Sequence, residues 1–323
     1  MASAKHSLIE LPFNLSIIGQ RMSPVEILFP LIFIVNSGFL SAKIGFIAIN
    51  QLDGLRTFIF NLCIPVLLFS SMVQADLESL ATGSLLLSFY LPVALTYAGL
   101  YLFLFKAQHR SKADSATLAL SGTYSNTVLV GLPIILMALG EQAAAMVFMI
   151  ITFHSAMLFF MTFLLAARHK NKVDIVKPLL LNPIVISISS GLILNIAGLK
   201  LPSLMLESFS WLAKPAIPGA LFILGASLVQ YGVRGKLHGA IWLSAVKLML
   251  LPGLVYLFAT YLGLATQQVQ VVTLMSASPL GVNAYLVARQ LDSQQATLAA
   301  TVVLSTVLSM VSLTGWLYFW YNR

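Results

Sequence analysis

Charged residues are scarce in this chain of 323 residues. Asp, Glu, Lys and Arg make up 9% of it, whereas 59% is hydrophobic and the mean hydropathy is +0.93. A soluble domain needs roughly a quarter of its residues charged to cover its surface. The shortage of charge therefore excludes a soluble globular domain and predicts a protein embedded in a membrane.

Cysteine and the familiar cofactor motifs are nearly absent as well. The single cysteine, Cys63, lies in an apolar run and has no partner for an internal disulfide. The sequence contains no Cys/His metal spacing, no Walker loop, no Rossmann glycine pattern and no nucleophile–base set. We therefore expect no cofactor, no metal and no enzymatic activity.

Acidic residues number only ten, and none falls at the centre of an apolar run. A cation antiporter needs buried carboxylates to exchange its ion. Their absence from these runs favours an anionic or neutral substrate over a cation.

Apolar runs, by contrast, are abundant, and each is long enough to cross a bilayer as a helix. Only short loops separate them. The pattern predicts an all-α polytopic membrane protein with about ten transmembrane helices. The expected spans are 24–42, 55–74, 83–105, 115–139, 143–167, 179–198, 205–231, 238–263, 267–289 and 294–320.

Lys and Arg are distributed unevenly between the two ends of these spans. The odd-numbered connections hold twelve of the 18 basic residues, and the positive-inside rule places those connections in the cytoplasm. This distribution accounts for the net charge of +8 without a nucleic-acid partner. We expect a multi-pass protein of a bacterial-type inner (plasma) membrane, with both termini outside the cytoplasm.

The two halves of the chain share glycine and proline positions at a constant shift of 153 residues. Such matches are informative because each marks a helix break or a close approach. An odd number of spans per half turns the second half over, which predicts two inverted five-helix repeats of the kind found in secondary transporters. The matched positions are Pro30 and Pro183, Gly38 and Gly191, Gly45 and Gly198, Pro65 and Pro218, and Phe69 and Phe222.

These halves define the expected organisation. Residues 1–23 form an N-terminal extracytoplasmic segment that lacks the order of a signal peptide. Residues 24–167 form the first five-helix repeat, and 179–320 form the second, inverted repeat. A basic cytoplasmic loop, 168–178, connects them.

Three segments resemble the auxin efflux carrier family, which includes the plant PIN carriers and many bacterial members. They are FNLCIPVLLFSSM in the second span, GTYSNTVLVGLPIILMALG in the fourth and SPLGVNAYLVARQ in the ninth. The resemblance implies two inverted five-helix repeats with broken, crossing helices 4 and 9, and the export of small organic anions. Plant carriers have Pro-Asn where this chain has Ser125 and Asn126, and they have a proline where this chain has Asn283. These departures argue against auxin as the substrate.

The two breaks are where we expect a substrate to bind. Pro133 and Pro279 each remove a backbone donor, and Ser278 before Pro279 indicates the N-cap and first residue of a new helix. A helix that starts at mid-membrane offers free N–H groups and a partial positive charge to a carboxylate. The candidate substrate-binding residues are Ser125, Asn126, Thr127, Gly131, Pro133, Ser278, Pro279, Gly281 and Asn283.

Asn126 and Asn283 are the leading candidates, because each lies beside a Gly/Pro break in corresponding spans of the two repeats. The alternative interpretation is that each amide hydrogen-bonds a neighbouring helix as part of the packing. Gly131 and Gly281 have a structural interpretation too, which is to let the fourth and ninth spans approach closely.

Three basic or titratable side chains also have two interpretations. Lys247 is either a counter-charge for an anion or a side chain that snorkels to the interface, and the sequence favours snorkelling. His154 fits a packing histidine better than a proton carrier. Arg289 either attracts outgoing anions or follows the positive-inside rule, and the second is favoured.

The sequence therefore predicts a secondary-active transporter that exports small organic anions (carboxylates) by alternating access. Its partners are a small organic acid and the lipid bilayer. One alternative is a sodium-coupled organic-anion symporter of the bile-acid carrier type, and another is an anion-sensing membrane receptor that does not transport. The sequence leaves open the acid, the driving ion, the net direction of transport in the cell and the oligomeric state, a homodimer included.

Overall fold

The computed structural model describes residues 23–48, 50–75, 83–140, 143–166, 181, 183–229 and 237–322, and every regular element within them is a helix. Seven helical stretches are long and apolar enough to cross a membrane, which confirms the prediction of an all-α polytopic membrane protein. The count of ten spans stays a prediction. The expected N-terminal segment up to residue 22 and the connecting loop 168–178 lie outside the described residues.

The helices follow the order of the expected spans along the chain. In order they are α1 (Pro24–Lys43), α2 (Gln51–Phe58), η2 (Ile59–Cys63), α3 (Ile64–Val73), α4 (Gly83–Leu102), η3 (Phe103–Ala107), α5 (Lys112–Thr123), η4 (Thr127–Gly131), α6 (Leu132–Leu139), α7 (Ala144–Leu165), α9 (Pro183–Ile196), α10 (Ser203–Ala213), α11 (Ala216–Leu228), α12 (Leu237–Ala245), η6 (Val246–Leu250), α13 (Leu251–Tyr261), α14 (Thr266–Ala277), α15 (Asn283–Leu291) and α16 (Gln295–Tyr321). The segments labelled η are π-helical turns within or beside these helices.

Three of the π-helical segments share a sequence cause. Each of η2, η4 and η6 ends two residues before a proline, namely Pro65, Pro133 and Pro252. In an α-helix the proline ring clashes with the carbonyl four residues earlier. A π turn holds an extra residue, which makes room for the ring and lets the helix continue. Pro133 therefore marks a change of helical pitch, and the chain unwinds several residues upstream of it.

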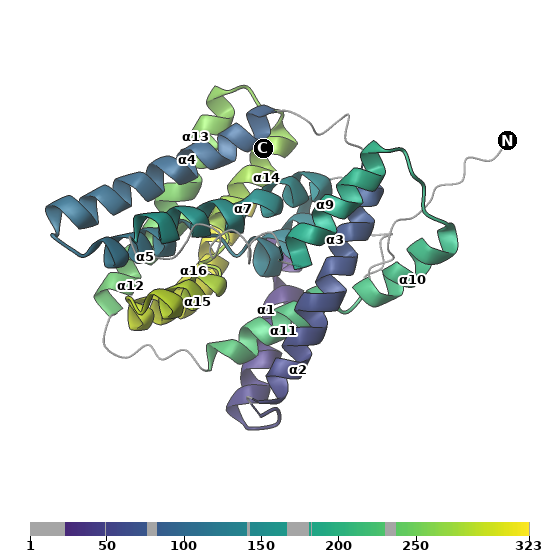
Figure 1. Cartoon of the computed structure of the whole chain (residues 1–323), viewed down its shortest axis with the longest axis horizontal. Helices are drawn as coiled ribbons and strands as arrows, with labels where there is room; N and C mark the ends of the chain where they lie inside the picture. The colour runs from purple at the N-terminus through teal and green to yellow at the C-terminus, as the bar shows by residue number, and fades with distance from the viewer. Residues whose placement is uncertain are drawn as a thin grey trace.

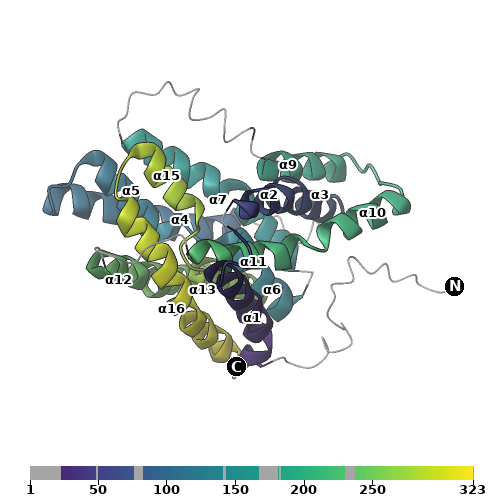
Figure 2. The same ribbon diagram turned by 90° about the horizontal axis from the view of Figure 1, so that it is seen from below.

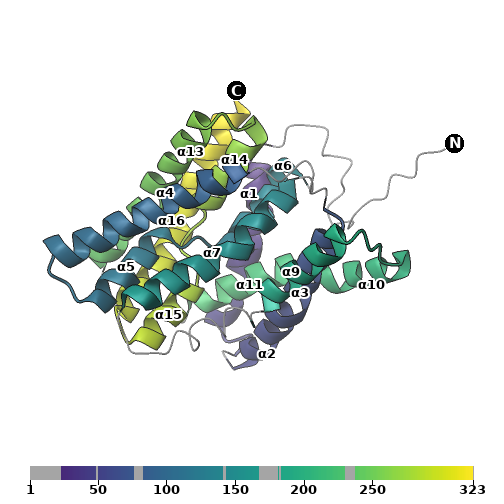
Figure 3. The same ribbon diagram turned by 45° about the horizontal axis from the view of Figure 1, so that its top comes forward.

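The helices pack into two groups (Figure 1). We call α1, α2–η2–α3, α9, α10 and α11 the first bundle, within which α1 packs along α11 and α3 along α9. The second bundle contains α4, α5, η4–α6, α7 and α12 to α16, with α4 against α5 and α13, and α12 against α16. Figure 2 shows α1 next to α11, and Figure 3 shows α3 beside α9. Each bundle thus combines helices from both halves of the chain.

Glycines bring the helices of the first bundle into backbone contact. A Cβ added to Gly38 would overlap the carbonyl group of Phe222, and a Cβ added to Gly191 would overlap that of Phe69. Residues 38 and 191, like residues 69 and 222, are 153 positions apart. The same glycine-to-carbonyl contact therefore occurs twice, once from each half of the chain onto the other. This is the pattern that two repeats related by symmetry would produce.

Candidate functional site

The fourth and ninth predicted spans are both interrupted, as the sequence predicted. Helix α5 ends at Thr123, residues 124–126 are not helical, and η4 begins at Thr127. In the ninth span α14 ends at Ala277, and α15 begins only at Asn283, after the non-helical residues 278–282. We call these two unwound segments, 124–126 and 278–282, the crossing.

The two unwound segments bind each other through their main chains. The N–H of Asn126 donates to the carbonyl oxygen of Pro279 at 2.8 Å, and the N–H of Gly281 donates to the carbonyl oxygen of Tyr124 at 3.1 Å. They form an antiparallel bridge centred on Ser125 and Leu280. The expectation that the breaks leave these main-chain groups free for a solute is therefore wrong for both pairs, because the crossing itself satisfies them.

Side chains from neighbouring helices accept hydrogen bonds from two further main-chain N–H groups at the bridge. The N–H of Ser125 donates to Nε2 of His154 in α7 at 2.9 Å, and the N–H of Leu280 donates to Oγ of Ser305 in α16 at 3.0 Å. Both acceptors are fully buried. Buried main-chain donors without a partner would cost free energy, so these two contacts help to stabilise the unwound backbone.

The capping prediction for the ninth span was wrong, whereas the fourth span has a cap that Asn126 provides. Oδ1 of Asn126 accepts from the N–H of Leu129 at 3.3 Å and caps η4. Ser278, by contrast, ends α14 in an extended conformation, and its Oγ donates to the carbonyl oxygen of Leu274 at 3.1 Å. Proline disfavours helical geometry at the residue before it. Pro279 itself also stays outside a helix, and the new helix starts only at Asn283.

Tyr124 and His154 form an aromatic contact against the bridge. Their rings stack with centroids 5.1 Å apart, and the Tyr124 hydroxyl lies 2.8 Å from Oγ of Ser155. His154 is fully buried, and its Nδ1 has no hydrogen-bond partner among the described residues. His154 is therefore a packing residue with a defined role, which is to accept the Ser125 N–H.

Lys247 does not snorkel, contrary to the favoured interpretation of the sequence. Its side chain is fully buried, and Nζ donates to the carbonyl oxygen of Ser276 at 2.5 Å. Ser276 belongs to the last turn of α14, where unpaired carbonyls carry partial negative charge. The ammonium group thus holds the end of α14 next to the crossing.

Two glycines of the crossing region are sites of close approach. A Cβ at Gly281 would overlap the ring of Tyr124, and a Cβ at Gly131 would lie 2.8 Å from Sδ of Met275 and 3.0 Å from Oγ of Ser278. These contacts match the structural interpretation of both glycines. They set how closely the broken helices pass each other.

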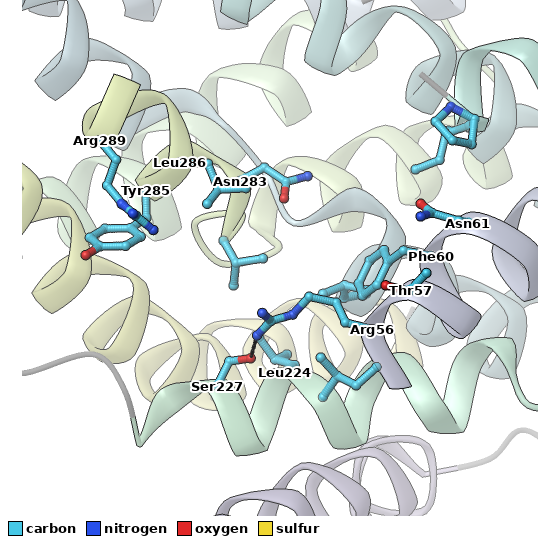
Figure 4. Close-up of a pocket in the computed structure, with 15 residues that line it drawn as sticks. Arg56, Thr57, Phe60, Asn61, Leu224, Ser227, Asn283, Tyr285, Leu286 and Arg289 are labelled. Atoms are coloured by element: carbon cyan, nitrogen blue, oxygen red, sulfur yellow. Dashed lines mark hydrogen bonds between the residues drawn. The ribbon is translucent and has the colours of Figure 1, made fainter. Parts of the chain in front are cut away.

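A cavity of about 530 Å³ lies between the two bundles and reaches the crossing (Figure 4). The first bundle contributes α2–η2, α9 and α11, and the second contributes η4, α15 and the end of the crossing. None of the described residues that line it is Asp or Glu. They are Arg56, Thr57, Phe60, Asn61, Leu129, Pro183, Ile184, Ile223, Leu224, Ser227, Val282, Asn283, Tyr285, Leu286 and Arg289.

A smaller pocket of about 50 Å³ continues from this cavity to the crossing. The two share Phe60, Leu129, Ile184, Val282 and Asn283. The small pocket adds four predicted site residues to Asn283, namely Ser125, Asn126, Thr127 and Gly281. Four other predicted residues line neither space: Gly131, Pro133, Ser278 and Pro279.

Comparison with known proteins assigns the chain. The family described as "Membrane transport protein" matches residues 24–178 and 170–317, which together cover most of the sequence. The chain belongs to the membrane transport protein family. A curated relative from Rhizobium meliloti (strain 1021) is 28% identical over 305 residues, covering 90% of this chain and 92% of the relative, and bears the name "Putative malonate transporter". The match confirms the resemblance to the auxin efflux carriers.

In this membrane transport protein the sequence did not single out Arg56 or Asn61. Arg56 counted only as a basic loop residue, but it lies in α2 and its guanidinium group lines the cavity. Its Nη2 donates to Oγ of Ser227 at 2.9 Å and its Nη1 to Oδ1 of Asp53 at 3.1 Å. Asn61 stands in the segment FNLCIPVLLFSSM that carries the family resemblance. Its place four residues before Pro65 is the sequence signal that could have drawn attention to it, and the structure has a π turn there.

Proposed function

We propose that this membrane transport protein exports small organic anions by alternating access and binds them where the crossing meets the cavity. One observation carries the proposal. The cavity between the bundles ends at the amide groups of the crossing, has two arginines in its wall, and has no acidic side chain among its described lining residues. Such a surface attracts anions and repels no carboxylate.

The crossing offers side-chain donors to a carboxylate. Nδ2 of Asn126 is buried at the small pocket and has no hydrogen-bond partner among the described residues. Asn283 lines both the small pocket and the cavity. A buried donor without a partner is costly unless a ligand or water completes it. The unpartnered Nδ2 makes Asn126 a proposed binding residue, and Asn283 is proposed with it because its exposed side chain lines both spaces.

The relative's name supplies the first ligand to try. Malonate is a small dicarboxylate, and a compact anion of this kind fits a site formed by amides and guanidinium groups. The proposal covers small carboxylates as a class, and malonate is the member that we would measure first.

The alternating-access mechanism rests on the two-bundle arrangement and the repeated glycine contacts. We propose that residues 24–167 and 179–320 are inverted repeats, since Gly38 and Gly191 make matching contacts across the halves. Arg56 and Arg289 lie at the ends of spans predicted to face the cytoplasm of a bacterial inner membrane. On this assignment the cavity opens to the cytoplasm, and a shift of one bundle against the other exposes the crossing to the opposite side.

Flux measurements on asparagine variants test the proposal. We expect Asn126→Ala and Asn283→Ala each to lower malonate flux in proteoliposomes about tenfold or more, the usual effect of losing a hydrogen bond to a charged group. Asn50→Ala is the matched control, because Asn50 is exposed and makes no cap hydrogen bond. Normal flux in both variants, at unchanged thermal stability, contradicts the assignment of the site.

The same liposomes separate the alternative mechanisms. Flux that requires a sodium gradient would indicate a sodium-coupled symporter, and flux that continues without sodium excludes it. A protein that is stabilised by malonate but shows no counterflow would be a receptor. We expect counterflow in sodium-free buffer.

A further inference from the structure

The two arginines of the cavity belong to different bundles. Arg56 comes from α2 in the first bundle, and Arg289 comes from α15 in the second. Figure 4 shows the two side chains entering the cavity from separate helices, with Asn283 also facing it. The cationic wall of the cavity is therefore assembled from both bundles.

Arg56 is oriented by two hydrogen bonds, and the acidic partner in one of them is exposed to solvent. Ser227 of α11, which is buried, accepts one hydrogen bond from the guanidinium group, and Asp53 accepts another. Asp53 is largely exposed, and an exposed ion pair is screened by water. A guanidinium group has five N–H donors, so several remain for an anion in the cavity.

Arg289 lies on the same face of α15 as Tyr285 and Leu286. Val282, Tyr285, Leu286 and Arg289 follow the helical spacing of i, i+3, i+4 and i+7. Asn283 stands in the first turn of α15 and Arg289 in the last, six residues later, which corresponds to about 9 Å along the helix axis. One helix thus presents an amide near the crossing and a cation farther out.

The α2–η2 segment of the other bundle also brings one arginine and one asparagine to the cavity. Arg56 lies in its first half, and Asn61 follows five residues later, about 7.5 Å along the axis of a regular helix. Apolar side chains, among them those of Leu129, Ile184 and Leu224, complete the lining. The cavity therefore combines amide and guanidinium groups with apolar side chains.

We infer that the arginine end is a second carboxylate subsite, which makes the protein selective for short dicarboxylates over monocarboxylates. The inference rests on the proposed function, in which one carboxylate binds the asparagines of the crossing. A monocarboxylate binds the asparagines through its one carboxylate, and the arginines add little to its affinity. A dianion of three or four carbons places its second carboxylate between two guanidinium groups, which bind carboxylates in a bidentate manner.

This subsite exists only while the bundles are held as they are here, because each bundle supplies one of its two cations. A bound dianion links Arg56 to Arg289 and stabilises this conformation. A monoanion makes no such link. The number of charges on the substrate therefore determines how strongly it favours this state over the alternative one.

Matched ligands and matched variants test the inference. The ligands are malonate and its half-ester monomethyl malonate, which has nearly the same size but one charge fewer. The variants are Arg56→Gln and Arg289→Gln, with Arg110→Gln as control, since Arg110 is exposed and bonds only to Gln108 among the described contacts. Affinity is measured by competition for counterflow in proteoliposomes.

We expect the unmodified protein to bind malonate at least tenfold more tightly than the half-ester. Each cavity variant should weaken malonate binding about tenfold and change half-ester binding less than twofold, and the control should change neither. The Arg289 side chain makes no hydrogen bond among the described residues, so Arg289→Gln removes none, and Ser227→Ala removes only the bond that orients Arg56. These two variants keep the test valid if Arg56→Gln does not fold.

The possible failures are distinguishable. If the arginine variants lose affinity for both ligands equally, or if the unmodified protein binds both equally tightly, the proposal of a second subsite is wrong. Organic-anion transport would still stand. If the unmodified protein moves neither malonate nor the half-ester nor other carboxylates, the proposed function itself is wrong.

Discussion

At the scale of single residues, His154 links a membrane-spanning helix to an unwound one. Its Nε2 accepts the Ser125 N–H at 2.9 Å, and its ring stacks on Tyr124. An imidazole nitrogen that accepts a hydrogen bond carries no proton, so the tautomer at this site has its proton on Nδ1. The contact therefore requires a neutral histidine.

Replacing this acceptor tests its contribution. His154→Phe keeps an aromatic ring against Tyr124 but leaves the Ser125 N–H without a partner in a buried position. We expect the free energy of unfolding to fall by about 1–3 kcal/mol, the cost of an unsatisfied buried donor. Thermal unfolding in detergent measures this, and His238→Phe, at an exposed position of α12, is the control. Equal melting temperatures for the two variants would show that the Ser125 N–H finds another acceptor.

Which residues the sequence identified depended on how local their contacts are. Asn126 could be predicted because its cap partner, Leu129, lies three residues away and a glycine and a proline follow it. Arg56 could not, because its partner Ser227 is 171 residues away. Lys247 was misread for the same reason, since the carbonyl that receives its ammonium group belongs to another helix.

At the scale of helices, glycine contacts determine how α1 and α11 pack. A Cβ at Gly38 would overlap the Phe222 carbonyl group, and a Cβ at Gly225 would overlap the Val35 carbonyl group. Small residues at membrane helix interfaces allow this close approach, and dispersion forces then stabilise the pair. The backbones on both sides leave no room for adjustment.

Alanine substitution tests these two contacts. We expect Gly38→Ala and Gly225→Ala each to destabilise the protein by about 1–3 kcal/mol, because the helices must separate to accept the methyl group. Gly99→Ala and Gly315→Ala are matched controls, since an added Cβ at either meets no described atom within 4 Å. Melting temperatures in detergent report the difference. Controls as unstable as the test variants would mean that helix contact is not the cause.

Helix breaks were easier to predict from sequence than helix starts. Polar residues and Gly/Pro pairs indicated both interrupted spans, and the structure has both. The cap and first residue of α15 were placed at Ser278 and Pro279, four residues too early. Proline fits the first turn of a helix, but it fits an extended segment equally well. The pairing of that segment with residues 124–126, distant in sequence, decided between them.

At the scale of the whole molecule, the proposed orientation can be tested by chemical labelling. Asp292 and Lys200 are both exposed and are predicted to lie on opposite sides of the membrane. We expect a membrane-impermeant maleimide to label Lys200→Cys in intact cells and to label Asp292→Cys only after permeabilisation. The native Cys63 is fully buried and gives a low background. The reverse pattern would invert the topology and place the cavity mouth outside the cell.

Hydropathy predicted the class of the fold, and the shift of 153 residues marked Gly38 and Gly191, which make equivalent contacts in the structure. Neither could predict the two bundles, because each bundle takes helices from both halves of the chain. The cavity between them depends on contacts across the whole length of the sequence, such as α1 with α11 and α3 with α9. Those contacts leave no trace in the local pattern of any one span.

The main-chain bridge between Ser125 and Leu280 has a consequence for how such carriers diversify. Amide and carbonyl groups are the same in every residue, so the scaffold that holds the two unwound strands together does not depend on which side chains they carry. Mutation is free to exchange the groups that face the solute while the framework that presents them persists. One architecture can then bind many substrates, and a change of substrate requires only a few substitutions.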